Sequence, residues 1–201
     1  MKIFKTKKIL QKFHFLFKKK QILNLKSGFT LVEILVVTSI IIMLSSMLLA
    51  NYELGNYRLS LDRALHKLVQ DIRRAEEMAM SSNTRFQGCS PGLPQGYGVY
   101  FDLDNSTSTY ILFADCTGSG KHDLQSVTVE TMSIEEGIFL NAFLWPPGYR
   151  QLSIVFKPPD PTVCIVDCIS GGDRASINLA SKSGLQGTVS LNKRGLIEIL
   201  Q

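Results

Sequence analysis

One carboxylate lies inside the longest apolar run of the chain. Residues 29–50 read FTLVEILVVTSIIIMLSSMLLA, and Glu33 is the only charged residue among them. A helix of this length spans roughly 33 Å at about 1.5 Å per residue, which is enough to cross the hydrocarbon core of a bilayer. A carboxylate in that medium is costly unless a cation lies close by. We therefore expect Glu33 either to pair with a cation or to lie near the membrane interface.

The four cysteines, Cys89, Cys116, Cys164 and Cys168, all follow the apolar run. An even number on one side of a membrane segment favours disulfides in an oxidising compartment, and four buried free thiols are the alternative. Because Cys89 precedes and Cys116 follows a predicted hairpin, the pairing Cys89–Cys116 is preferred, which leaves Cys164–Cys168 to close a small loop. Two other connectivities stay open. Zinc is not expected, since this C-x3-C spacing has no matching second pair.

The histidines do not form a catalytic pattern. His14 lies in the N-terminal segment, His66 on the polar side of a predicted helix, and His122 beside Asp123 in a loop, where we interpret the two as a surface pair. The sequence contains no G-x-S-x-G nucleophile motif and no phosphate-binding glycine loop. The chain is therefore expected to be neither an enzyme nor a cofactor-binding protein.

Two loops carry further polar or aromatic side chains. Residues 115–123 read DCTGSGKHD and are faintly similar to a calcium loop, but the terminal glutamate is missing, so a polar turn is preferred and no metal is expected. Residues 145–149 read WPPGY. This rigid aromatic loop is interpreted as a packed connection, with a partner contact as the alternative.

The positive charge of the chain is concentrated at its N-terminus. Nine lysines and no acid occur in residues 1–28, which leaves 13 of the 22 basic residues against 17 acidic ones, a net charge of −4 for the remainder. Lysines before an apolar run predict an N-terminus in the cytoplasm and a C-terminal part outside it. A cleaved secretory signal peptide is the alternative, but the run is long for a signal core and lacks a good cleavage site after it.

A second helical pattern follows the apolar run. Apolar residues recur at steps of three and four from Leu61 to Ala79, which predicts one buried stripe on a helix. The helix is expected to run from Phe29 to about Ser81, with some weakening at Gly55-Asn56. Residues 29–50 then form its transmembrane part, and residues 51–82 its amphipathic continuation. The members of the stripe are Leu61, Leu65, Leu68, Ile72, Ala75 and Ala79.

Short strand-like runs separated by turns make up residues 83–201, which are therefore expected to form a β-rich domain. The predicted fold class is α+β: a long N-terminal helix packed on an antiparallel, β-sandwich-like domain. The polar turn at 104–108 joins the first two strands into a hairpin. The strands are predicted at residues 97–103, 109–114, 126–134, 152–156, 162–166, 176–180, 187–192 and 195–200.

Residues 26–33 read KSGFTLVE and resemble the prepilin peptidase site of type IV pilins and type II secretion pseudopilins. The resemblance implies a pilin fold, removal of residues 1–28 as a leader, a cut between Gly28 and Phe29, and N-methylation of Phe29. Glu33 is then the fifth mature residue, which in that superfamily helps to align subunits. A glutamate there can pair with the Phe29 amine of a neighbouring subunit.

The rest of the chain resembles one branch of that superfamily, the FimT-like and GspH-like minor pilins. The similar segments are residues 68–80 (LVQDIRRAEEMAM), 96–102 (GYGVYFD) and 187–195 (GTVSLNKRG). Three features depart from the pattern: a long leader, Ala50 where many major pilins have a kinking proline, and GLIE at 195–198 where DNA-binding FimT-like proteins carry G-R-x-R.

The resemblance implies a minor pilin or pseudopilin that helps to prime or cap a filament at a bacterial inner membrane, with its C-terminal domain in the periplasm. The implied partners are other pilin or pseudopilin subunits, prepilin peptidase, the inner-membrane assembly platform and the lipid bilayer. One alternative is a DNA-binding minor pilin acting in DNA uptake, with Lys182, Lys193 and Arg194 as candidate phosphate contacts. Another is an unrelated single-pass membrane protein with a sensor domain.

Overall fold

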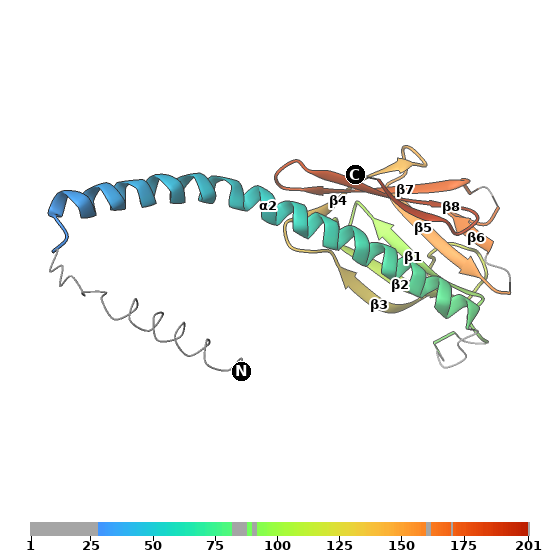
Figure 1. Cartoon of the computed structure of the whole chain (residues 1–201). Helices are drawn as coiled ribbons and strands as arrows, with labels where there is room; N and C mark the ends of the chain where they lie inside the picture. The colour runs from blue at the N-terminus through green and yellow to red at the C-terminus, as the bar shows by residue number, and fades with distance from the viewer. Residues whose placement is uncertain (1–27, 82–87, 90–91, 160–161, 170, 201) are drawn as a thin grey trace, which may run out of the picture. The chain divides into compact units, whose positions relative to one another are not determined.

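The computed structural model describes residues 28–81, 88–89, 92–159, 162–169 and 171–200 (Figure 1). Except for Gly28, the predicted leader lies outside these residues. The chain divides into two compact units, Met1–Met47 and Leu48–Gln201, with the boundary inside the helix α2 (Leu31–Met80). Each unit is described by itself.

Helix α2 begins and ends close to the predicted residues. The expected weakening at Gly55-Asn56 is wrong, because the helix passes through both residues without a break. A glycine costs a helix only about 1 kcal/mol relative to alanine. The intact hydrogen-bond ladder on either side of Gly55 outweighs that cost.

Helix α2 contains a candidate membrane span. Leu31–Leu49 has a mean hydropathy of 2.4, and none of it is buried within the protein. Apolar side chains surround this segment on all sides, from Leu31, which is 79% exposed, to Leu49, which is 70% exposed. A helix that is apolar all round is suited to lipid rather than to one face of a soluble core.

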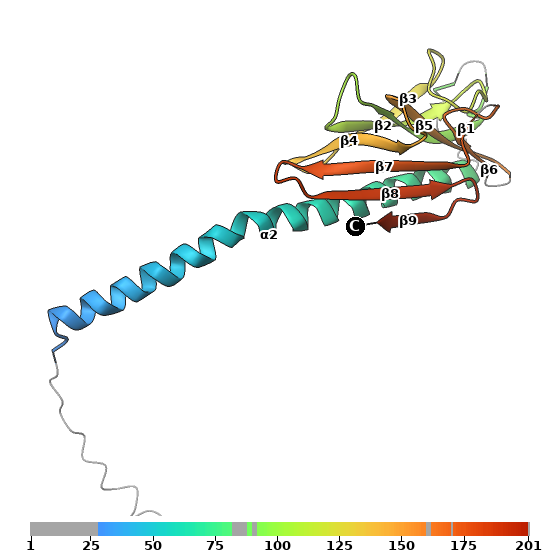
Figure 2. The same ribbon diagram turned by 90° about the horizontal axis from the view of Figure 1, so that it is seen from above.

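Nine strands follow α2 among the described residues, and they form two antiparallel sheets (Figures 1 and 2). The first sheet has the order β3-β2-β1-β5-β6, and the second has the order β4-β7-β8-β9. The α+β class and the antiparallel sheets are as predicted. The strands are β1 (Gly96–Asp102), β2 (Thr109–Asp115), β3 (Val127–Ser133), β4 (Ile138–Trp145), β5 (Gln151–Lys157), β6 (Thr162–Ile165), β7 (Arg174–Ser181), β8 (Gln186–Asn192) and β9 (Ile197–Leu200).

Strand β4 is absent from the sequence prediction. Its pairing with β7 shifts register between Leu140 and Ala142 and again between Phe143 and Trp145. Its buried residues are consequently Ile138, Leu140 and Phe143, at steps of two and then three. Bulges break the period of two on which strand recognition depends, so this strand cannot be found by alternation.

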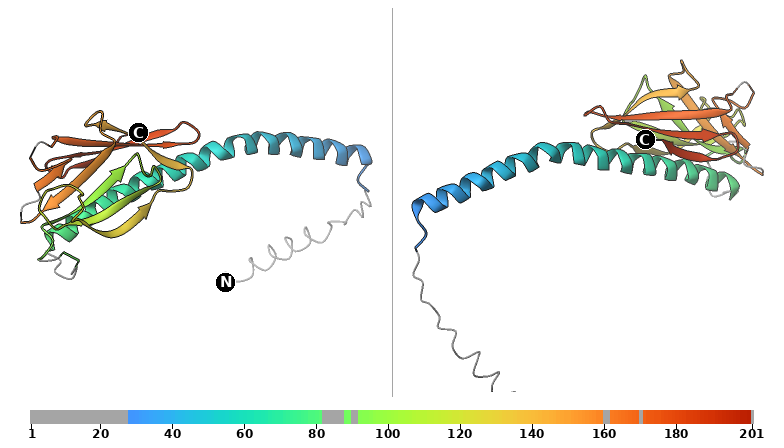
Figure 3. Two further views of the ribbon diagram at one scale, coloured as in Figure 1. Left: turned by 180° about the vertical axis from the view of Figure 1, so that it is seen from behind. Right: turned by 45° about the horizontal axis from the view of Figure 1, so that its top comes forward.

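The predicted apolar stripe on α2 is confirmed, since all six of its residues are buried. Leu65, Leu68 and Ile72 lie in one hydrophobic core with side chains from both sheets, and in Figures 2 and 3 the C-terminal half of α2 lies against the strands. Strand β8 approaches the helix closely: a Cβ on Gly187 would lie 2.5 Å from Leu65 Cδ1. The sheets contribute Val99, Phe101, Leu112, Ile154 and Phe156, and Leu140, Ile177, Leu179, Val189 and Leu191.

Polar contacts hold the same helix segment to strands β2 and β3. The Tyr110 hydroxyl donates a hydrogen bond of 2.5 Å to Asp71 Oδ2, and burial together with this carboxylate raises the pKa of Tyr110 above its ordinary value. Lys67 Nζ donates to the carbonyl of Ser133 at 2.7 Å. These bonds fix the axial position of the helix against the sheet, which the non-directional packing of the stripe does not do.

Tyr110→Phe should lower the free energy of unfolding by about 2 kcal/mol, because it removes a hydrogen bond to a charged group at a buried site. Tyr110 is 3% exposed, whereas Tyr149 is 48% exposed and makes no hydrogen bond within the described part of the chain, so Tyr149→Phe is the matched control. Urea unfolding of the oxidised chain in detergent micelles measures both. Equal effects of the two variants would contradict a role for the Tyr110–Asp71 contact.

Candidate functional site

The first site is the segment that leads into α2. Gly28, Phe29 and Thr30 precede the helix outside any regular element, and all three are exposed. Phe29 is 77% exposed, and a Cβ on Gly28 would meet no atom within 4 Å. The Gly28–Phe29 peptide bond is therefore sterically accessible in this unit.

Thr30 caps the helix that carries Glu33. The backbone N–H of Glu33 donates to Thr30 Oγ1 at 3.2 Å, and the N–H of Ile34 donates to the Thr30 carbonyl at 3.2 Å. Thr30 thus occupies the N-cap position and its hydroxyl caps the backbone N–H of Glu33 at N3; the T-x-x-E spacing of this helix start was present in the sequence but missing from its interpretation. A carboxylate at this end is also favoured by the helix dipole.

Glu33 is the only ionisable residue in the candidate span Leu31–Leu49. The hydroxyls of Thr38, Ser39 and Ser46 donate to the carbonyls three residues earlier, at 3.0, 2.8 and 2.8 Å, so these side chains satisfy themselves along the helix. The Glu33 carboxylate has no such bond among the described residues. As the one charged side chain of the span, it needs a partner from elsewhere if the span lies in lipid.

The second site is the loop that follows β2, which two disulfides hold. Cys89 pairs with Cys116 at a Cα–Cα distance of 5.4 Å, and Cys164 pairs with Cys168 at 4.6 Å, the two pairs that the hairpin argument favours. A Cβ on Gly120 would lie 2.1 Å from Cys168 Sγ, and its φ of 74° is in the left-handed region. The loop therefore packs directly on the second disulfide at a position that only glycine fits.

The acidic residues of this loop are engaged by the protein itself. The buried Asp115 carboxylate accepts backbone N–H bonds from Thr117, Gly118 and Gly120 at 3.1, 2.8 and 2.7 Å. Burial alone would raise the pKa of Asp123, but hydrogen bonds, among them those from the Ser119 and Thr117 hydroxyls, bring it below its ordinary value. This is the bonding pattern of a polar turn. Within the described residues, no group of three His, Cys, Asp or Glu side chains is arranged to hold a metal ion.

The interpretation of His122 and Asp123 as a surface pair is wrong. The imidazole is half-buried, stacked on Tyr100 with ring centroids 4.4 Å apart and edge-on to Phe113 at 5.0 Å. The backbone N–H of His122 donates to Ser153 Oγ at 3.1 Å. Burial lowers the pKa of His122 below its usual 6.5, and the charges of Asp123 and Asp102 oppose that shift. The ring therefore covers part of the outer face of the first sheet in its neutral form.

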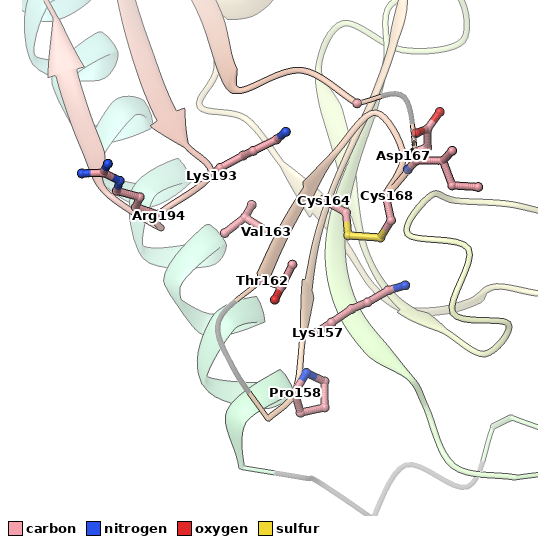
Figure 4. Close-up of a pocket in the computed structure, with 11 residues that line it drawn as sticks. Lys157, Pro158, Thr162, Val163, Cys164, Asp167, Cys168, Lys193 and Arg194 are labelled. Carbon is pink, nitrogen blue, oxygen red and sulfur yellow. Dashed lines mark hydrogen bonds between the residues drawn. A yellow bond between two sulfur atoms is a disulfide. The ribbon is translucent and has the colours of Figure 1, made fainter.

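The third site is the basic set considered for DNA. The structure does not bring its three members together: Lys182 lies just before β8, and Lys193 and Arg194 lie just after it. A strand of seven residues separates them, roughly 20 Å. Lys193 and Arg194 line a groove of about 760 Å³ beside the Cys164–Cys168 loop (Figure 4). The strand predicted at residues 187–192 already lies between them, so this separation could be derived from the sequence.

The aromatic loop after β4 is not the packed connection that the sequence suggested. Trp145 is 49% exposed and Tyr149 is 48% exposed.

No family model, no curated protein and no solved structure matches this chain.

The His122 environment predicts how stability depends on pH. A histidine whose folded-state pKa is lowered contributes fully above its unfolded value of about 6.5, and the free energy of unfolding falls as the pH drops below that value. His122→Phe keeps an aromatic ring in the slot and removes the proton, so it should flatten the dependence between about pH 6.5 and 5. Tyr149→Phe, which alters an exposed aromatic ring and no group that titrates near pH 6, should leave the slope unchanged. Urea midpoints across that range measure this, and an unaltered slope in His122→Phe would refute it.

Proposed function

We propose that this chain is a pilin-like subunit: a minor pilin or pseudopilin that is cut between Gly28 and Phe29 and built into a filament of a type IV pilus or type II secretion system. The observation that carries the proposal is the start of α2. An accessible Gly28–Phe29 bond is followed, four residues after Phe29, by the only carboxylate of the candidate span Leu31–Leu49. The KSGFTLVE string at this point is the feature that resembles a prepilin peptidase site.

Cleavage at this bond has a direct electrostatic consequence. It creates an ammonium group on Phe29 and removes the nine lysines of the leader. The new cation and the Glu33 carboxylate are each expensive in lipid alone, and a pair of opposite charges costs less than two separated ones. A neighbouring subunit whose amine meets Glu33 neutralises both groups. Assembly is therefore favoured only at the axial offset that brings the two groups together.

The proposed topology follows from charge and cysteine chemistry. The lysine-rich leader stays on the cytoplasmic side of the inner membrane, and unit Leu48–Gln201 lies on the periplasmic side, where disulfides persist. The core of that unit is built from α2 and both sheets together. Its partners are then other subunits, prepilin peptidase, the assembly platform and lipid.

Processing is the first test. In cells that contain a prepilin peptidase, the chain should lose residues 1–28 and carry one added methyl group on Phe29, as measured by intact-mass and N-terminal peptide mass spectrometry. Gly28→Leu should block the cut, because a branched side chain obstructs the scissile backbone. Gly55→Ala, at a helix position with open space around it, should be processed normally. Recovery of an intact Met1 in the native chain would end the proposal.

Glu33→Gln separates pairing from capping. The observed cap joins the Thr30 hydroxyl to the backbone N–H of Glu33, so the substitution leaves the cap in place and changes only the charge of the side chain. If Glu33 pairs with an amine, the neutral amide should reduce incorporation into sheared filaments by about tenfold or more, the equivalent of at least about 1.4 kcal/mol. Glu53→Gln, an exposed glutamate on the same helix, is the matched control. Normal incorporation of the Glu33 variant would leave the residue with a capping role alone.

A further inference from the structure

Two turns in unit Leu48–Gln201 carry opposite paired charges. Glu135-Glu136-Gly137 joins β3 to β4, and Lys193-Arg194-Gly195 joins β8 to β9. Each turn has two like charges followed by a glycine in the left-handed region, with φ of 81° for Gly137 and 79° for Gly195. The two turns thus share one backbone conformation and carry side-chain charges of opposite sign.

The turns lie at opposite ends of the second sheet. The backbone N–H of Lys182 donates to the carbonyl of Gly137 at 3.1 Å, so the acidic turn lies beside the residues that precede β8. Lys193 follows the other end of β8 and bonds back to the Asp173 carbonyl at 3.1 Å. Figure 2 shows the full length of β8 between these two ends. One copy therefore presents an acidic turn at one end and a basic turn at the other.

The charges of both turns are available for an outside partner. Among the described residues, the side chains of Glu135, Glu136 and Arg194 make no ion pair and no hydrogen bond. Lys193 Nζ lies 2.7 Å from Asp173 Oδ1, but the two side chains are 50% and 90% exposed. An exposed pair of this kind contributes little and exchanges partners readily.

The basic end is also hollow. The groove of about 760 Å³ beside the Lys193-Arg194 turn is lined by Lys157, Thr162, Val163 and Ile169, among others. Figure 4 shows Lys193 reaching toward the Cys164–Cys168 loop and Arg194 pointing away from it. Ile169 is 97% exposed, which gives this end an uncovered apolar contact next to its cations.

Side chains of opposite charge near each turn reduce its net charge. Asp167 lines the basic groove, and Arg63 and Lys182 share a second hollow of about 480 Å³ with Glu135 and Glu136. Each end therefore has only a small net charge. Charges at the rim of an interface of this kind set orientation and register more than affinity.

We infer that the Lys193-Arg194 turn of one copy receives the Glu135-Glu136 turn of a second copy, head to tail. Such a contact joins different surfaces of the two partners, so it is heterologous and adds copies in one direction instead of closing a dimer. This inference rests on the proposed filament and names the contact between its globular parts. It is independent of the lipid-buried pairing at Glu33.

Charge reversal in the full-length processed chain tests the contact. The variant Lys193→Glu/Arg194→Glu has two acidic ends, and the variant Glu135→Lys/Glu136→Lys has two basic ends. Each alone should self-associate at least about tenfold more weakly than the native chain in detergent micelles at low salt, measured by sedimentation. An equimolar mixture of the two, or one chain carrying all four changes, should recover association, because opposite charges meet again.

The controls separate this contact from a folding defect and from the anchor. Arg73→Glu/Lys121→Glu reverses two exposed cations elsewhere in the unit and should associate normally. Circular dichroism checks that each variant is folded. Association that is insensitive to the single reversals, or that the mixture does not recover, overturns the inference. A Lys193→Glu/Arg194→Glu variant that associates normally and loses only its salt-dependent binding to a DNA duplex also overturns the inference. A chain that is cut at Gly28 and still fails these tests leaves the proposed function standing, whereas a chain that is never cut removes that function first.

Discussion

Helix α2 carries two different patterns of apolar residues, and the packing of both sheets depends on the second. From Leu31 to Leu49 helix α2 is apolar on every side, and from Leu61 to Ala79 it is apolar along one stripe. The first pattern has no partner within the protein and is compatible with lipid, while the second is buried between two sheets. Both sheets depend on the stripe, because without α2 their inner faces would be exposed to water. Any movement of the helix along its axis is opposed by the directional Tyr110–Asp71 bond.

The parts of the fold that follow local rules were predictable. The stripe on α2, most strands and the α+β class could be derived from periodicity, because a helix or a regular strand buries residues at a constant spacing. Strand β4 could not, since two bulges change its spacing within eight residues. The prediction that Trp145 belongs to a packed loop failed for a related reason. A large aromatic side chain is expected to be buried, and only the strand register shows that this one points outward.

The residues of the candidate sites also differ in whether the sequence alone could predict their contacts. Thr30 and Glu33 are three residues apart, so their capping relation was readable from the T-x-x-E spacing alone. His122 lies next to Asp123 in sequence, yet its neighbours in space are Tyr100 and Phe113 on two strands of the first sheet. No local pattern encodes that slot. By contrast, the separation of Lys182 from Lys193 follows from the strand that was predicted between them at residues 187–192.

The proposed pairing of Glu33 and the cap that Thr30 forms act at the same end of α2. At N3 of α2 the Glu33 carboxylate lies near the positive end of the helix dipole. In a processed subunit its own Phe29 amine is only four residues away and can neutralise it before assembly. Pairing with a neighbour then exchanges one partner for another, and the net gain in free energy is small. In the proposed filament such an exchange adds little to the free energy of assembly, but every axial offset that leaves one charge unpaired in lipid is penalised. Glu33 would then determine chiefly the register of the subunits. The contacts between the globular parts would supply the rest of the binding energy.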